Sequence, residues 1–246
     1  MKVIEIKGLT KLYENKRGIN NLNFTLDAGK ILCIIGNNGA GKTTALKCIM
    51  NLLIPDRGEI LINGNSIFMD SKKYKKNISY IPEVPIYYNE LTVYDHLKFI
   101  AMAYEMDYKE FDKKVKFYAS KYEVENYLHC YFNELSKGTK QKMFLIMTLI
   151  KRSSLLILDE PFDGLDVFTV DKLINCLKEL RNDSVSVIIT SHNMDIVSEV
   201  SDYLLILKDS NQIVYDSVND LYAKYKTNDL GYIFKNIMLK DTSEYV

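Results

Sequence analysis

The most informative stretch of the sequence runs Ile31-Leu32-Cys33-Ile34-Ile35 and passes directly into Gly36-Asn37-Asn38-Gly39-Ala40-Gly41-Lys42-Thr43. Five apolar residues in a row predict a strand that is covered on both faces, as in a parallel sheet. The segment that follows matches G-x-x-x-x-G-K-[ST], in which a tight turn directs several backbone N–H groups into one concavity. The stretch therefore predicts a site for the phosphates of a nucleotide.

The residues of this loop have distinct expected roles. Lys42 is expected to reach the β- and γ-phosphates, and the hydroxyl of Thr43 to bind Mg²⁺. The other expected ATP-binding positions are Gly36, Asn37, Asn38, Gly39, Ala40, Gly41 and Thr44. A glycine-rich turn without a ligand is the alternative, but average residue frequencies produce this pattern by accident on the order of 1% of the time. ATP and Mg²⁺ are thus the expected cofactors.

A second apolar strand ends in two adjacent acids. Leu155–Leu158 leads directly into Asp159 and Glu160. Asp159 is placed to hold Mg²⁺ through its water shell, and Glu160 to polarise an attacking water. An acidic pair can also simply end a strand at the surface, but a phosphate loop in the same chain favours the catalytic interpretation.

Composition and charge narrow the class of protein. The chain has 246 residues, 47% hydrophobic and 26% charged, which is typical of a globular protein of one or two domains. Lys and Arg number 32, as do Asp and Glu, so nucleic acid is not an expected partner. No apolar run approaches the roughly 18 residues of a membrane span, and no signal-peptide pattern opens the chain. A cytoplasmic location with four reduced cysteines is expected.

The spacing of apolar residues predicts an α/β fold. Further strands are expected at Val3–Ile6, Val185–Thr190 and Leu204–Leu207, and the helical period between Val167 and Leu180 completes a β-α-β unit. Segments such as Glu59–Ile62 predict a small antiparallel element near the amino terminus.

Helical patterns replace the strands between residues 92 and 150, beginning at Thr92-x-x-Asp95. The expected fold is a P-loop NTPase core with a mainly parallel sheet, the small antiparallel element, and a helical subdomain inserted at about residues 85–150.

Two further motifs carry a resemblance to a known family. Leu135-Ser136-Lys137-Gly138-Thr139-Lys140-Gln141 resembles the signature sequence of ABC (ATP-binding cassette) ATPases, and Ser191-His192 resembles their switch histidine. Phosphate loop, helical insert, signature, acidic strand, Gly164-Leu165-Asp166 and His192 also follow one another in the family's order. The resemblance covers residues 1–225 as the cassette domain and leaves 226–246 as a short C-terminal helical tail.

The resemblance implies a reaction centre shared between two cassettes that face each other head to tail. Each ATP would lie between the phosphate loop of one cassette and the signature of the other. The residues expected to act in trans are Ser136, Lys137, Gly138 and Thr139. Glu160 and His192 would form the catalytic pair, and Asp166 would belong to the D-loop. An ordinary capped helix start at Leu135–Gln141 remains an alternative for the signature.

Four further positions resemble the family's pattern or depart from it. Tyr13 resembles the aromatic residue on which the family stacks adenine, although a core or surface role stays open for one of 18 tyrosines. Glu83 stands where the family usually carries glutamine, and its carboxylate could accept from a water on Mg²⁺. Lys137 and Thr139 replace the typical glycine and glutamine, and Lys137 is either a solvated charge or an added electrostatic contact.

The implied function is that of the ATP-hydrolysing subunit of a multisubunit ABC transporter at the cytoplasmic face of the cell membrane. Its implied partners are a second cassette, identical or closely paralogous, and an integral membrane permease. The short tail and the form Ser136-Lys137-Gly138 resemble exporters.

The family receives a short helix of its membrane subunit near the aromatic residues Tyr87, Tyr88, Tyr94 and Phe99, for which ordinary packing is the alternative. A soluble cassette ATPase acting on ribosomes or DNA is the second hypothesis. A P-loop kinase or nucleotide switch outside the family is the third, and the signature and His192 argue against it.

Overall fold

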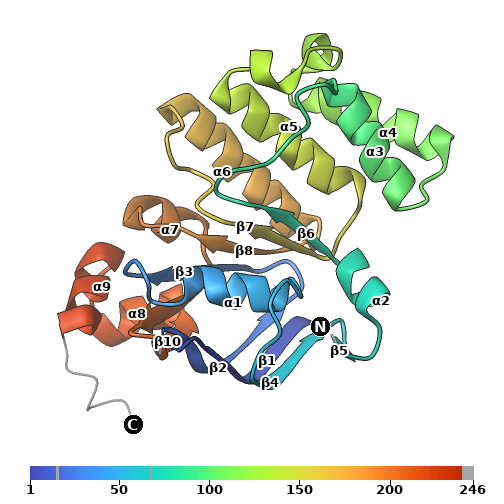
Figure 1. Cartoon of the computed structure of the whole chain (residues 1–246). Coiled ribbons are helices and arrows are strands. Elements are labelled where there is room, and N and C mark those ends of the chain that lie inside the picture. Colours follow the sequence, from blue (N-terminus) through green and yellow to red (C-terminus); the bar gives the residue numbers. More distant parts are fainter. Residues whose placement is uncertain (15–16, 67, 240–246) are drawn as a thin grey trace.

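The computed structural model describes residues 1–14, 17–66 and 68–239, and these residues form a single mixed sheet with helices around it (Figure 1). The strands are β1 (Lys2–Leu12), β2 (Gly18–Asp27), β3 (Ile31–Gly36), β4 (Arg57–Ile62), β5 (Asn65–Ser66), β6 (Ile78–Ile81), β7 (Leu155–Leu158), β8 (Ser186–Thr190), β9 (Tyr203–Lys208) and β10 (Asn211–Ser217). Their order across the sheet is β5-β4-β1-β2-β10-β9-β3-β8-β7-β6.

Helices occupy most of the remaining chain. They are α1 (Lys42–Ile49), α2 (Ser71–Lys76), α3 (Val93–Ala103), α4 (Tyr108–Lys121), α5 (Lys137–Ile150), α6 (Val167–Asn182), α7 (Met194–Val200), α8 (Val218–Tyr225) and α9 (Leu230–Leu239). None of the helices in the described part of the chain combines the length and the apolar character needed to cross a membrane. Of the expected tail, α9 lies within 226–246, and residues 240–246 lie outside the described residues.

The centre of the sheet is parallel and covered on both faces, as the apolar runs predict. β3 pairs in parallel with β8 and β9, and β7 pairs in parallel with β6 and β8. Alternate side chains of β3 enter opposite hydrophobic cores: Leu32 and Ile34 face the core that contains α1, whereas Ile31, Cys33 and Ile35 face the core that contains α6. The predicted fold class is confirmed, and with it the buried environment expected for Cys33.

The antiparallel part of the sheet is larger than the sequence indicates. β1 extends to Leu12 and pairs with both β2 and β4, and β2 has no counterpart among the predicted strands. Only Asn211 and Asn20 pair in the ladder between β10 and β2, the seam that joins the two parts of the sheet. The hydroxyl of Tyr215 on β10 reinforces this seam by donating to the carbonyl of Thr25 on β2.

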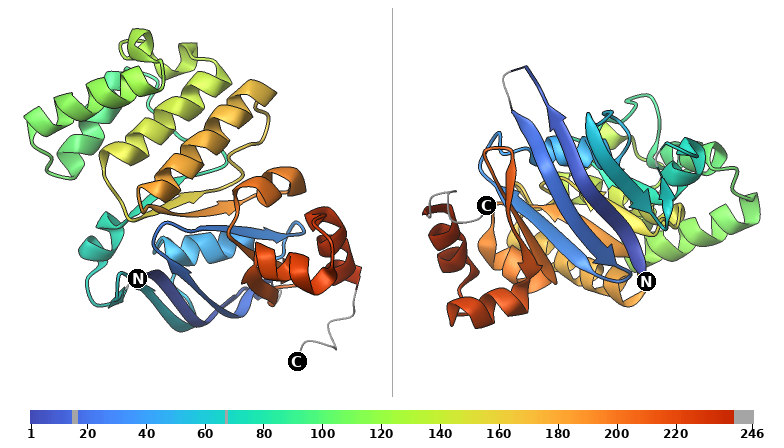
Figure 2. Two further views of the ribbon diagram at one scale, coloured as in Figure 1. Left: turned by 180° about the vertical axis from the view of Figure 1, so that it is seen from behind. Right: turned by 90° about the horizontal axis from the view of Figure 1, so that it is seen from below.

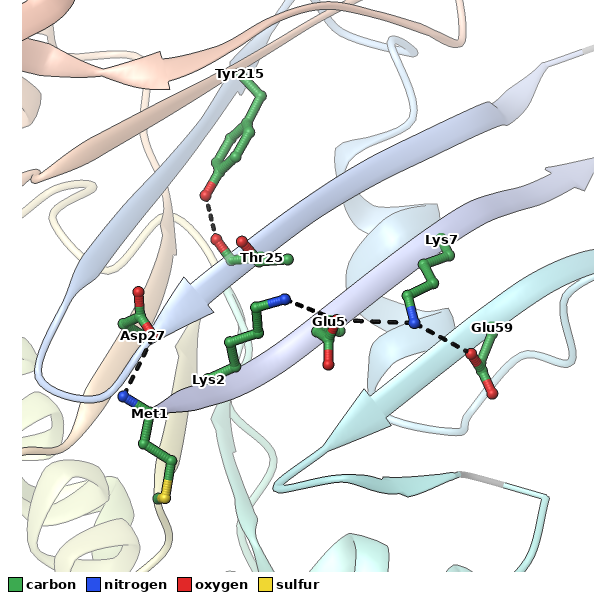
Figure 3. A network of polar contacts seen from close by, with 8 residues as sticks. All are labelled: Met1, Lys2, Glu5, Lys7, Thr25, Asp27, Glu59 and Tyr215. Atoms are coloured by element: carbon green, nitrogen blue, oxygen red, sulfur yellow. Dashed lines mark hydrogen bonds and ion pairs between the residues drawn. The ribbon is translucent and has the colours of Figure 1, made fainter.

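Charged side chains line the exposed face of the antiparallel strands (Figure 3). The ion pairs join the amino group of Met1 to Asp27, Lys2 to Glu5, Lys7 to Glu5, and Lys7 to Glu59. Hydrogen bonding from Lys2 holds the pKa of Glu5 below its ordinary value. Such exposed pairs contribute little to stability, so this face is a solvated surface rather than part of the core.

The helices α3, α4 and α5 pack around a hydrophobic core of their own, with Leu97, Phe111 and Phe132 buried among them (Figures 1 and 2). The expected helix start is confirmed: Thr92 accepts from the N–H of Asp95, and Asp95 accepts from the N–H of Thr92. The following segment returns to the sheet through β7, so these helices are inserted between β6 and β7.

Candidate nucleotide-binding site

The phosphate loop is held open by backbone geometry that only glycine permits. Gly41 has φ +108°, and a Cβ at this position would collide with the carbonyl oxygen of Gly18 on β2. No side chain caps the amino end of α1, which begins at Lys42. The first N–H groups of α1 are therefore available to an anion, and the positive end of the helix dipole favours one there.

The loop forms the floor of a cleft of about 570 Å³, within the usual size range of ligand sites. The cleft is lined by Tyr13, Arg17, Gly18, Asn37, Asn38, Gly39, Ala40, Gly41, Lys42, Thr43, Thr44, Glu83, Asp159, Glu160, Asp163 and His192. Segments from five separate places in the sequence thus meet at the carboxyl ends of β3, β7 and β8. This is where parallel α/β sheets bind ligands.

Lys42 lies at the base of this cleft and is almost fully buried. Its Nζ donates to the carbonyl of Gly36 at 2.6 Å, so the side chain follows the inside of the loop. Burial lowers the pKa of Lys42, and the nearby carboxylates of Glu160 and Asp159 oppose that shift. The cation is therefore positioned between the loop and the two strand-tip acids.

Glu160 has the most perturbed carboxyl group in the cleft. Burial raises its pKa to about 7, Lys42 acts against this, and the negative charges of Asp163, Asp159 and Glu83 add to it. Nε2 of His192 lies 2.8 Å from Oε1 of Glu160. A carboxyl group that titrates near neutral pH beside an exposed imidazole is suited to general-base chemistry.

The raised pKa of Glu160 leads us to expect that the free energy of unfolding depends on pH. The folded chain keeps the proton on Glu160 up to about pH 7, whereas the unfolded chain releases it near the ordinary value of 4.5, so Glu160 lowers stability as pH rises through this window. Glu160→Gln should therefore raise Tm at pH 8.5 by about 2–4 °C, on the order of 1 kcal/mol after screening in the open cleft.

Thermal melting in metal-free and nucleotide-free buffer measures this effect. The gain in Tm should shrink steadily as the pH is lowered toward 4.5, because the buried carboxyl is then neutral in both proteins. A gain in Tm that is the same at every pH would mean that the side chain does not titrate in this range.

The signature residues lie outside the cleft of their own chain. Ser136 is the N-cap of α5 and accepts from the N–H of Thr139 at 3.2 Å, so the ordinary capped helix start is present. Nζ of Lys137 donates to the carbonyl of Asp163 at 2.6 Å, and Gly138 packs against Thr169. The structure therefore places the signature beside the segment that follows Glu160.

Asp166 also has a local structural partner. It caps α6 by accepting from the N–H of Thr169 at 3.0 Å and from its hydroxyl at 2.7 Å, and these bonds hold the pKa of Asp166 below its ordinary value. Gly164, two residues earlier, has φ +64° and lies against the ammonium of Lys137. Of the two expectations for Lys137, a solvated charge or an added contact, the structure shows a contact within the chain, from the ammonium to the carbonyl of Asp163.

Five residues around the cleft were not anticipated. Arg17, Gly18 and Asp163 line it, and Tyr80 and Thr190 approach its acids from the neighbouring strands β6 and β8. Two of these positions carry a local signal: Gly18 marks a turn beside Arg17, and Asp163 follows Glu160 by three residues. Tyr80 and Thr190 depend on strand pairing, which a single sequence does not reveal.

The parallel sheet, the glycine-rich loop leading into α1 and the acids at the end of β7 define a P-loop nucleotide-binding protein. Residues 19–163 match the family described as ABC transporter. The chain is 31% identical over 229 residues to the ABC-type transporter ATP-binding protein EcsA of Bacillus subtilis, covering 93% of each chain. It is 32% identical over 223 residues to the SkfA peptide export ATP-binding protein SkfE of the same organism, covering 91% of this chain and 90% of that one.

The chain belongs to the ABC transporter family of ATP-binding proteins, whose members are generally ATPases. Its fold agrees: a solved structure described as an ATP-binding subunit of an ABC transporter superposes with a TM-score of 0.89. That structure is 28% identical, and the match covers 96% of this chain and 99% of the other. Membership of this family implies that the chain binds ATP.

Proposed function

We propose that this chain hydrolyses ATP as the subunit of a multisubunit ABC transporter, with MgATP bound between two head-to-tail cassettes. One observation carries the proposal. The cleft gathers the phosphate loop, both strand-tip acids and His192, whereas Ser136 and Gly138 lie outside it at the exposed start of α5. The cleft therefore holds one half of the expected contacts. This supports a second cassette, a copy or a close paralogue, as the source of the other half.

Binding of ATP is assigned to the floor and the rim of the cleft. The open N–H groups at the start of α1 and the ammonium of Lys42 face the space where phosphates would lie. Tyr13 is 45% exposed at the rim, and its ring is free to stack on adenine. Arg17 also lines the cleft near this rim.

The residues present fit Mg²⁺. This ion prefers oxygen ligands, and the hydroxyl of Thr43 and the carboxylate of Asp159 both line the cleft. Glu83 lines it as well and could accept from a water on the ion. When bound, Mg²⁺ neutralises charge on the phosphates during transfer.

The chemistry is assigned to Glu160 and His192. Glu160 takes a proton from a water molecule, whose oxygen forms a bond to the γ-phosphorus while the bond from that phosphorus to its bridging oxygen breaks. His192 contacts the carboxyl group of Glu160 and keeps it directed at the cleft. Hydrolysis removes the bridge between the cassettes, so that the pair opens.

An apolar groove about 550 Å³ in volume lies between the sheet and the inserted helices. Of the four aromatic residues expected at a membrane-subunit contact, two are partly buried against the core of the inserted helices: Tyr87 stacks on Phe132 at 5.1 Å, and Tyr94 packs on Phe111 at 5.6 Å between ring centroids. The other two, Tyr88 and Phe99, line the groove. Ordinary packing thus explains half of the set.

Tyr88 and Phe99 offer the groove's exposed apolar surface together with Ile86, which is 93% exposed. The floor of the groove includes Ile81 and Pro82, and the next residue, Glu83, lines the nucleotide cleft. We infer that the groove receives a segment of the membrane subunit, because a ligand there would contact the same short chain segment that reaches the nucleotide.

Phe99→Asp should abolish recovery of a polytopic membrane protein with the tagged chain from solubilised membranes, because a buried charge would be left unpaired in the apolar groove. ATP turnover by the isolated chain should be unchanged. Phe117→Asp is the matched control, since Phe117 is 59% exposed against 56% for Phe99 and does not line the groove. Equal loss of the partner in both variants, or recovery of ribosomes or nucleic acid instead, would contradict the proposal.

The remaining assignments follow from the same proposal. We propose that residues 1–225 act as the cassette, that the helical subdomain at about 85–150 carries the groove, and that 226–246 form a tail. The chain would lie on the cytoplasmic face of the membrane through its permease. Export is supported by the similarity to SkfE, which is named for peptide export.

A further inference from the structure

The two acids at the end of β7 share a single hydroxyl group. Thr190, the last residue of β8, is fully buried. Its Oγ1 donates to Oδ1 of Asp159 at 2.6 Å and accepts from the backbone N–H of Glu160 at 2.8 Å. One side chain on the neighbouring strand therefore fixes an atom of each acid.

The two hydrogen bonds act on different features. The bond to Oδ1 restrains the rotation of the Asp159 carboxylate. A hydroxyl donates one proton, so it holds one carboxylate oxygen and leaves the other for a further ligand. The bond from the N–H of Glu160 fixes a backbone turn: Glu160 has φ +46°, a left-handed conformation that non-glycine residues adopt only when their surroundings impose it. Glu160 is thereby turned out of the strand direction toward the cleft.

Asp159 is also contacted from the opposite side. β7 lies between β6 and β8, and the phenol of Tyr80 on β6 lies close enough to Asp159 to be affected by its charge. Burial, followed by the charge of Asp159, raises the pKa of Tyr80 to about 12, so the phenol remains a donor at neutral pH. The Asp159 carboxylate thus lies between Thr190 of β8, which donates to it, and the protonated phenol of Tyr80 on β6.

We propose that Thr190 is the positioning residue that fixes the metal-binding acid and the catalytic acid relative to each other. The inference rests on the proposed function, because it assigns Asp159 to Mg²⁺ and Glu160 to the attacking water. Packing alone does not explain why a hydroxyl-bearing residue stands at position 190. The three residues before it on β8, Val187–Ile189, are apolar, and within the described residues the hydroxyl of Thr190 bonds to the Asp159 carboxylate and the Glu160 N–H alone.

Thr190→Val removes the hydroxyl and keeps the shape. Equilibrium binding of ATP should be unchanged in excess chelator, whereas the gain in affinity on adding Mg²⁺ should fall about tenfold or more. Turnover should fall about 10–100-fold through kcat. Thr190→Ser keeps both hydrogen bonds and should restore the Mg²⁺ effect and kcat.

Ser186→Ala is the matched structural control. Ser186 is the fully buried first residue of the same strand, and its hydroxyl donates to the carbonyl of Asp27 at 2.9 Å without touching either acid. This variant loses one buried hydrogen bond and should keep the wild-type response to Mg²⁺.

The outcomes distinguish a failure of the proposed ATP hydrolysis from a failure of the proposed role of Thr190. A wild-type chain that does not hydrolyse MgATP would overturn the proposed function. An active wild type with a Thr190→Val variant that matches it in Mg²⁺ response and kcat would overturn the role of Thr190 alone. Thr190→Ala serves if the valine variant fails to fold, as judged by its ATP affinity in chelator, and the same two readouts decide the question.

Discussion

Glu160→Gln should lower the turnover of ATP by about 10²–10⁴-fold, the range that a general base typically supplies. The amide occupies the same volume but does not accept a proton from water at neutral pH. Nucleotide affinity should persist, because the phosphate loop and Lys42 are unchanged and the substitution removes a negative charge that faces the polyphosphate. Steady-state phosphate release and equilibrium binding of labelled ATP measure the two quantities separately.

The same variant should accumulate as a dimer. If ATP bridges two cassettes and is not cleaved, the bridge persists, so size-exclusion chromatography in MgATP should show a species of twice the monomer mass. Glu59→Gln makes the same chemical change on the exposed face of β4, where Glu59 pairs with Lys7 at 3.8 Å, and should behave as wild type. Near-normal turnover in Glu160→Gln would exclude Glu160 as the base.

The parts of the site that could be predicted are those encoded by adjacent residues. The phosphate loop and the acids of β7 each follow an apolar run, and a parallel sheet brings the carboxyl ends of such strands to one edge. The cap at Thr92 is equally local. In each case the chemistry is decided within a few residues of the strand or helix that positions it.

The parts that were missed depend on which strands lie side by side. β2 interrupts its apolar residues with Asn20, Asn21 and Asn23, and β10 is only partly buried along its length. The two strands pair with each other although their paired residues lie 191 positions apart in the sequence. Tyr80 and Thr190 reach Asp159 only because β6 and β8 flank β7. A single sequence contains the strands but not their order, so these contacts could not be derived from it.

Lys137 illustrates a third kind of limit. The sequence shows that Lys137 belongs to the signature. It does not show the partner of Lys137, because that partner is the backbone carbonyl of Asp163, a group that every residue has. The contact joins the start of α5 to the segment that leaves Glu160. A bond to a backbone carbonyl is set by the local path of the chain, which only the structure provides.

If the reaction centre is shared between two cassettes, as proposed, mixtures of variants should recover activity selectively. Lys42→Ala damages the phosphate-loop half of a composite site, and Ser136→Asp damages the signature half. Aspartate caps a helix as well as serine does, so α5 should persist while the added charge repels the polyphosphate. Each variant alone should be nearly inactive, but in a mixed dimer one site receives both intact halves. An equal mixture should therefore recover about one quarter of wild-type turnover if dimers form at random and their sites act independently.

The matched control is an equal mixture of Lys42→Ala and Glu160→Gln. Both lesions lie in the cleft of their own chain, so in a mixed dimer every site contains one of them, and no turnover should return. The two mixtures carry the same number of substitutions and differ only in whether the lesions fall in the same half of the site. If the catalytic machinery were complete within one chain, neither mixture would recover activity. Equal behaviour of the two mixtures would therefore contradict the head-to-tail arrangement, whereas recovery confined to the pair with Ser136→Asp requires that Ser136 act on the nucleotide of the other chain.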